Sequence, residues 1–139
     1  MKPEHENNLK AEFPGLFGNM KREIECESGW DDLIRALSLQ MIEFEKATGI
    51  KIDVKQVKEK FGELRYYAIP NIDCINQGLD GECWSRIVGR AINQASIRSP
   101  HICEICGQHG KMRTITRGNS SRYWTLCDEH FEQEKKRNQ

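Results

Sequence analysis

The first long stretch of helical periodicity lies between Ser28 and Gly49. Ser28-Gly29-Trp30-Asp31 has the Ser-x-x-acid form of a helix-capping signal, and Gly49 is a natural helix stop. Between them, apolar side chains recur at steps of three and four residues, which places them on one face of a helix. The spacing predicts a helix over about 29–48 with this face in the core. Its apolar positions are Trp30, Leu33, Ile34, Leu37, Met41 and Phe44.

After Gly49 the hydrophobic period changes from helical spacing to strict alternation. Such alternation predicts two strands that form an antiparallel hairpin, with its turn around 58–61 and its end at Pro70. The Gly, Asp and Asn residues of 71–81 indicate a loop. The alternating apolar positions are Ile50, Ile52, Val54, Leu64, Tyr66 and Ala68.

A second amphipathic helix is expected over about 82–97. Ser99-Pro100 ends it and marks the one clear module boundary, because the residue before a proline disfavours helical geometry. We therefore predict an α+β body over 1–99, in which 1–20 are peripheral, and a second module over 100–139. The apolar face of this helix consists of Trp84, Ile87, Val88, Ala91 and Ala95.

The strongest chemical signal lies after that boundary. Cys103-x-x-Cys106 is followed after twenty residues by Cys127-x-x-His130, and a Cys3His set at this spacing suits a tetrahedral zinc site. Gly107 fits the tight backbone turn of a metal knuckle. Because protein ligands would fill all four positions, we expect one structural Zn²⁺ per chain rather than a catalytic zinc with a bound water.

The residues between and after these ligand pairs predict a hairpin and a helix. Two short strands over 112–116 and 123–126 flank a polar tip at 117–121, and a helix with acids early and bases late follows Cys127. Knuckle, hairpin and a helix that supplies the last two ligands resemble a treble-clef zinc module. The resemblance implies that the metal takes the place of a core, since a structural zinc supplies on the order of 10 kcal/mol of apparent folding free energy.

The other thiols and one histidine leave alternatives open. His109 lies between the ligand pairs and is the alternative to His130, whose two-residue gap from Cys127 is tighter. Buried free thiols are the expected state of the three unpaired cysteines, and a disulfide between two of them would require oxidising conditions. These cysteines are Cys26, Cys74 and Cys83, with Cys74–Cys83 as the pair in question.

Composition narrows the setting. The 139 residues include 21 basic and 21 acidic side chains, so no uniform field directs the chain to nucleic acid or to a membrane surface. The acids gather in 1–49, whereas 50–69 and 101–139 are mildly basic, so any contact with a polyanion would be local. No apolar run approaches the ~20 residues of a membrane span, and the amino terminus lacks a secretory signal. We expect a cytoplasmic protein.

The chain resembles a group of small phage- and prophage-encoded proteins. The resemblance spans about 13–130 and rests mainly on three motifs, which are Val57-Lys58-Glu59-Lys60-Phe61-Gly62-Glu63-Leu64-Arg65-Tyr66-Tyr67, Cys103-Glu104-x-Cys106-Gly107 and Leu126-Cys127-x-x-His130. Gln108-His109-Gly110 and Tyr123-Trp124 stand where relatives carry Pro-Gly and Gly-Trp. The resemblance implies a shared fold, a bacterial-host setting and action on host machinery or host defence. It carries no enzymatic activity over to these residues.

Both predicted hairpins combine cations with aromatic rings, which is the composition of a phosphate-binding and base-stacking surface. The alternative for the first is a solvated strand face above a core face, with Phe61, Leu64 and one tyrosine inside. For the second, the alternative is an aromatic ring that covers the metal. The first group is Lys58, Lys60, Arg65, Tyr66 and Tyr67, and the second is Arg113, Arg117, Arg122, Tyr123 and Trp124.

Three functions follow from these features. We favour a non-enzymatic binding protein whose body and zinc module together face a host protein, because no catalytic constellation is visible. The second is a binder of nucleic acid or of a small nucleotide through the two hairpins. The third and weakest is an HNH-like nuclease, since treble-clef cores occur in that class; the strand over 112–115 carries no histidine to serve as its base.

Overall fold

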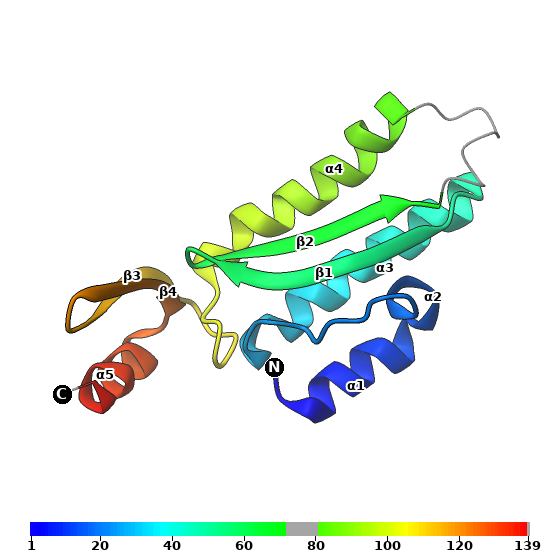
Figure 1. Cartoon of the computed structure of the whole chain (residues 1–139). Helices are drawn as coiled ribbons and strands as arrows, with labels where there is room; N and C mark the ends of the chain where they lie inside the picture. Colours follow the sequence, from blue (N-terminus) through cyan, green and yellow to red (C-terminus); the bar gives the residue numbers. More distant parts are fainter. Residues whose placement is uncertain (72–80, 139) are drawn as a thin grey trace.

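The computed structural model describes residues 1–71 and 81–138 and has an α+β fold with two antiparallel hairpins, as predicted (Figure 1). Short 3₁₀ helices are labelled η. The elements are α1 (Pro3–Glu12), α2 (Pro14–Phe17), η1 (Ser28–Trp30), α3 (Asp31–Thr48), β1 (Ile52–Lys60), β2 (Glu63–Pro70), α4 (Gly81–Arg98), η3 (Ser99–His101), β3 (Lys111–Arg117), β4 (Ser120–Leu126) and α5 (Asp128–Arg137).

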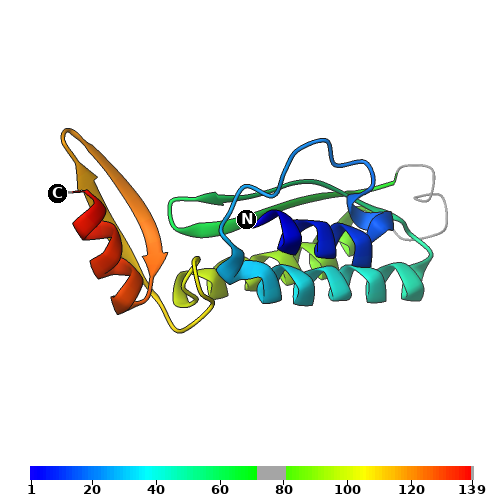
Figure 2. The same ribbon diagram turned by 90° about the horizontal axis from the view of Figure 1, so that it is seen from below.

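The β1–β2 hairpin forms one layer of the body, and α1, α3 and α4 form the other (Figure 2). Because successive side chains of a strand point to opposite faces, one face of the hairpin is apolar and packs on the helices. Val57 pairs with Tyr66 in the middle of this ladder, and a bulge interrupts β1 between Val54 and Gln56. The buried side chains of this face are Ile52, Val54, Val57, Leu64 and Tyr66.

The turn of this hairpin has an unusual residue. Phe61 and Gly62 both have positive φ, 55° and 80°, and Phe61 is the only such non-glycine residue in the described chain. Turns of this kind favour Asn-Gly, because a Cβ is strained at positive φ. Phe61 is 62% exposed, so the alternative that placed it inside the core was wrong, and burial does not compensate for this strain.

The amino-terminal segment is part of the core, so the prediction that 1–20 are peripheral was wrong. Leu9 and Leu16 are fully buried, and Phe13 and Phe17 form an edge-to-face pair with 6.5 Å between ring centroids. The segment escaped sequence analysis because α1 carries only Leu9 as a buried residue on an otherwise polar surface. Its apolar residues act through packing on α3 and β1.

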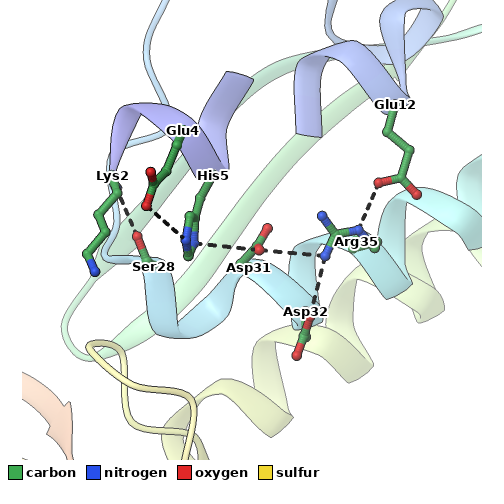
Figure 3. A network of polar contacts seen from close by, with 8 residues as sticks. All are labelled: Lys2, Glu4, His5, Glu12, Ser28, Asp31, Asp32 and Arg35. Carbon is green, nitrogen blue, oxygen red and sulfur yellow. Dashed lines mark hydrogen bonds and ion pairs between the residues drawn. The ribbon is translucent and has the colours of Figure 1, made fainter. Parts of the chain in front are cut away.

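A polar network fastens α1 to the beginning of α3 (Figure 3). The Ser28 hydroxyl accepts a hydrogen bond from the backbone N–H of Lys2 (2.9 Å) and does not cap α3. The capping interaction expected at Ser28 is therefore absent from the described structure, and η1 begins the helix. Arg35 links Glu12 of α1 to α3, with Nε to Oε2 at 2.8 Å.

Helix α4 packs along α3, although its face is narrower than predicted. Val88 and Ala95 are buried, and Trp84 lies edge-on to Phe44 with 5.5 Å between ring centroids. Ile87, which we placed on the apolar face, is half exposed because it lies at the margin of the contact with α3. In the described part of the chain, no helix combines the length and apolar character that crossing a membrane demands.

Candidate metal centre

The knuckle is built by backbone hydrogen bonds around Cys103. The N–H of Cys103 donates to the carbonyl of Gln108 (2.7 Å), and the N–H of Gly107 donates to the carbonyl of Cys103 (2.8 Å). Gly107 has φ +78°, which confirms the backbone demand inferred from its position after Cys106. The turn folds the two thiols toward the same side.

Strand β4 and helix α5 bring the second ligand pair to the knuckle. Cys127 follows the end of β4 and is the N-cap of α5, where its sulfur accepts from the N–H of His130 (3.5 Å). One helical turn separates Cys127 from His130, so both side chains face the knuckle. The predicted hairpin and polar helix are therefore confirmed, with strands that extend slightly closer to the tip.

The four ligand atoms form a compact cluster within 4.8 Å of one another. A tetrahedral Zn²⁺ would place two sulfurs about 3.8 Å apart and a sulfur about 3.6 Å from a nitrogen. The sulfurs of Cys106 and Cys127 are 3.9 Å apart, and Nδ1 of His130 lies 3.6 Å from Cys103 Sγ and 3.1 Å from Cys127 Sγ. This Cys3His group therefore has the size and donor set to hold one metal ion.

The thiols of the cluster differ in acidity. Burial alone would raise the pKa of Cys103, but the N–H groups of Cys127, Cys106 and Ile105 point at its sulfur and hold its pKa below the ordinary value. Burial, together with the hydrogen bond and charge of Cys103, raises the pKa of Cys106 to about 11. A divalent cation between the sulfurs would offset this mutual repulsion and keep the ligands as thiolates.

The other candidate ligands lie outside the cluster. His109 is exposed and does not belong to the group of ligand atoms, so His130 is the fourth donor. Cys26 is a buried free thiol, as predicted, and burial raises its pKa. Cys74 and the side chain of Cys83 lie outside the described residues, so their expected state stays a prediction.

Comparisons with known proteins give no further identity. No family model, curated protein or solved structure matches the chain. The centre is therefore interpreted from its own geometry.

The metal module docks on the body through a close backbone contact at Gly29. Its N–H donates to the carbonyl of Glu104 (2.6 Å), and a Cβ on Gly29 would lie 2.2 Å from the carbonyl oxygen of Cys103. Next to it, the indole N–H of Trp30 donates to the carbonyl of Ile102 (2.9 Å). The sequence indicated that Gly29-Trp30 begins a helix. The structure shows that these two residues also contact the knuckle.

Glu104 lies buried in this joint, and sequence analysis did not assign it a role. Its Oε1 accepts from the N–H of Glu27 (3.1 Å), whereas its Oε2 has no hydrogen-bond partner in the described structure. Burial, reinforced by the nearby charge of Glu59, raises the pKa of this carboxyl to about 7, although the bond from Glu27 opposes the shift. The only sequence signal for Glu104 was its place inside the Cys103-to-Cys106 motif.

A second contact joins the turn of the β1–β2 hairpin to the strands of the β3–β4 hairpin, at the end of that hairpin remote from its own turn. The hydroxyl of Thr125 donates to the carbonyl of Gly62 (2.7 Å), and the rings of Phe61 and Tyr123 meet edge to face with 6.4 Å between centroids. A Cβ on Gly62 would touch the side chain of Met112 at 3.2 Å. The β1–β2 turn and the strands of the β3–β4 hairpin, which are distant in sequence, therefore form one exposed surface.

The first cation–aromatic group is divided by the fold. Tyr66 is only 3% exposed, and its hydroxyl lies 3.1 Å from that of Ser38. It cannot stack on a base, so the prediction that it belongs to a binding surface was wrong. It belongs to the apolar face of the strand, which is the alternative that we left open. Arg65 is paired with Glu63 (2.8 Å). Lys58 lies beside the exposed ring of Tyr67, 5.9 Å from its centroid.

The second group is also divided. Trp124 is buried in the small apolar cluster of the metal module. The Arg122 guanidinium covers its ring, 3.9 Å from the centroid. Arg113 pairs with Asp128 and lies over Phe131, which removes it from the open surface. Among the described residues, no ion pair is formed by Arg117 at the tip. Tyr123 is exposed beside Phe61 as described above.

Proposed function

We propose that this chain is a zinc-stabilised, non-enzymatic binding protein that presents the junction of its two hairpins to a partner protein. Three thiolates and one imidazole favour Zn²⁺, and four protein ligands leave no position for a reacting water. In this proposal the metal folds residues 100–139 and holds the β3–β4 hairpin against the body. The role of the metal is structural.

The observation that carries the proposal is an exposed apolar patch at the junction of the hairpins. Phe61, Met112 and Tyr123 lie together at the tip of the β1–β2 hairpin, and we call them the tip patch. Their exposed fractions are 62%, 43% and 49%. Large apolar side chains gathered on a surface mark interaction sites, and aromatic residues dominate the energetics of such sites. The strained backbone of Phe61 adds weight, because the turn itself would be more stable with asparagine there.

A protein of a bacterial host is the proposed partner. The resemblance to phage- and prophage-encoded proteins supports this choice, and with it the bacterial cytoplasm as the site of action. Lys60 lies beside Phe61, 5.5 Å from its ring centroid, so the partner's complementary surface would be apolar with an acidic margin. A factor of host defence or of host takeover fits the proposal best.

The proposal is tested by Phe61→Asn, which removes the ring and suits the positive φ of the turn. We expect this variant and Tyr123→Thr to capture at least about tenfold less of the partner from bacterial extract, at unchanged stability. Ile97→Ser, at an apolar position on α4 that is 60% exposed, is the matched control and should retain capture. Equal loss in the control, or full capture by both tip variants, would refute the proposal.

An anion site on the zinc hairpin is a second candidate. A groove of about 220 Å³ lies between Arg117 and Arg122, on the face of β3–β4 that carries Ile115 and Trp124, and Ser120 contributes to its lining. Two guanidinium groups beside a small groove match the charge and size of a phosphate group. This observation favours a nucleotide or a nucleic-acid strand as ligand.

Salt dependence distinguishes this candidate from the first. Binding of a fluorescent single-stranded oligonucleotide should weaken steeply as salt rises, and Arg117→Ala should weaken it about tenfold at low salt. Arg90→Ala, an exposed arginine on α4, is the control. Binding that is insensitive to salt or to Arg117→Ala would exclude the groove as the site.

The nuclease hypothesis gains no support from the centre. Nδ1 of His130 lies among the three sulfurs, so it is committed to the metal and not free to act as a general base. Strand β3 carries Met112, Arg113, Thr114 and Ile115 where that chemistry needs a histidine. Magnesium-dependent cleavage of DNA by the purified chain would reverse this judgement.

A further inference from the structure

Among the described residues, no other strand covers the second edge of strand β2. Its first edge pairs with β1, and β1 in turn is covered on its far side by Glu25, whose N–H donates to Val57 (2.9 Å) and whose carbonyl accepts from Glu59 (3.0 Å). The second edge of β2 faces α4 (Figure 1). The body therefore ends, on this side, in an open strand edge.

The hydrogen-bonding groups on that edge can be assigned from Leu64. The N–H of Leu64 donates to the Ser99 hydroxyl (2.8 Å), and its carbonyl accepts from the Ser96 hydroxyl (3.0 Å). Alternate residues of a strand point these groups to the same edge, so those of Tyr66 and Ala68 also point away from β1. Within the described chain, no hydrogen bond reaches Tyr66 or Ala68 on this edge.

A groove runs along the same edge. Helix α4 contacts β2 near Ser96 and diverges from it toward its own amino-terminal end (Figure 1). A groove of about 260 Å³ lies between the helix and the strand. Tyr66 and Ile92 give it an apolar lining, and Gly89 opens its helical wall, because a Cβ there would have no atom within 4 Å. The unpaired backbone of Tyr66 thus lies beside an open groove.

We propose that an extended peptide segment of a partner protein binds in this groove and adds a third strand to the sheet beside β2. Donors and acceptors that repeat at strand spacing match another extended backbone, whereas a helix satisfies its own backbone groups. The peptide would carry small apolar side chains at alternate positions toward Ile92 and Gly89. Pro70 lacks an N–H and ends the pairing, so the added strand spans about four residues.

This inference is independent of the tip patch, and its test starts from an unbiased probe. Random peptides of about ten residues are displayed and selected on the full-length, zinc-loaded chain, and the enriched peptide is synthesised. We expect Gly89→Leu, which fills the groove with a good helix former, to weaken binding of this peptide at least about tenfold without lowering the melting temperature. Phe61→Asn should leave the affinity unchanged.

Two further measurements separate strand addition from nonspecific apolar binding. Methylation of alternate backbone nitrogens of the peptide should abolish binding for one set of positions and spare the other. Hydrogen exchange should show new protection at the amides of Tyr66 and Ala68. Failure to enrich any peptide, binding that survives Gly89→Leu, or protection elsewhere would overturn the proposal. So would a dimer that Gly89→Leu converts to monomer, because a second copy would then occupy the edge.

Discussion

The body and the zinc module solve the same problem of stability in different ways. The body buries a continuous apolar cluster that draws on α1, α2, α3, α4 and the β1–β2 hairpin. The module buries only Cys103, Ile115, Trp124 and Leu126 as a separate cluster beside the Cys3His centre. So small a core does not fold a segment of this length alone, and we infer that metal coordination supplies the difference. In the body, the stabilising contacts are therefore spread over many apolar side chains. In the module, we expect them to depend mainly on four metal ligands.

Removal of a metal ligand should have the largest effect and should be confined to the module. In Cys103→Ser, loss of coordination removes a share of the order of 10 kcal/mol that a structural zinc contributes, so 100–139 should unfold. Mass spectrometry should find about one zinc in the parent and none in the variant, with the body still folded by circular dichroism. His109→Ala, outside the cluster, should keep its zinc. A folded, metal-free parent would contradict the comparison.

Truncation of a core side chain should have the opposite pattern. Leu37 is 2% exposed, so Leu37→Ala should lower the free energy of unfolding of the body by about 2–5 kcal/mol. The variant should bind zinc as the parent does. Leu39→Ala, two residues along α3 and 49% exposed, should change stability by less than about 0.5 kcal/mol. Urea titration measures both, and equal midpoints for the two variants would contradict the assigned core.

A Cβ at Gly29 should loosen the joint between the two regions. It would lie 2.2 Å from the carbonyl oxygen of Cys103, so Gly29→Ala forces η1 away from the knuckle at a cost of about 1–3 kcal/mol. Hydrogen exchange should then be faster at the amide of residue 29, whose bond to Glu104 is lost, while zinc content stays constant. Gly15→Ala, where a Cβ meets nothing within 4 Å, should show neither change.

Loss of a surface ion pair should have the smallest effect. Glu12 lies 2.8 Å from Arg35 at the surface, and Asp31 and Asp32 remain near the guanidinium when Glu12 is replaced. Glu12→Gln should therefore change the free energy of unfolding by less than about 1 kcal/mol. Thermal melts at low and high salt measure this change, which salt should reduce further. A loss of stability as large as that of Leu37→Ala would show that the Glu12–Arg35 ion pair (Figure 3) contributes more than a surface ion pair normally does.

The sequence was informative wherever one local pattern decides the outcome. The spacing of two ligand pairs identified the four donors of the centre, and periodicity located α3, the β1–β2 hairpin and α4. A metal knuckle requires Cys or His at fixed short spacings, and an amphipathic helix or strand requires apolar residues at regular short intervals. Such patterns can be recognised without knowledge of the fold.

Features that depend on contacts between distant residues were missed. Leu9 and Phe17 are buried because other elements cover them, and nothing in their own short segments shows this. Glu104 resembles any charged knuckle residue until η1 is found against it. Tyr66 and Tyr67 are adjacent and chemically alike, and only the register of the strand decides which one enters the core.

The contact between Gly29 and Glu104 has a consequence for the order of folding during synthesis. The two residues are far apart in sequence, and the amino-terminal partner leaves the ribosome well before the knuckle exists. Helix α3 and the β1–β2 hairpin contain mostly local contacts, so we expect them to form while the rest of the chain is still being made. If the module folds on zinc as proposed, docking of η1 waits for the last forty residues and for capture of the metal. The supply of zinc to a newly made chain would then set the time at which its body receives its final contacts.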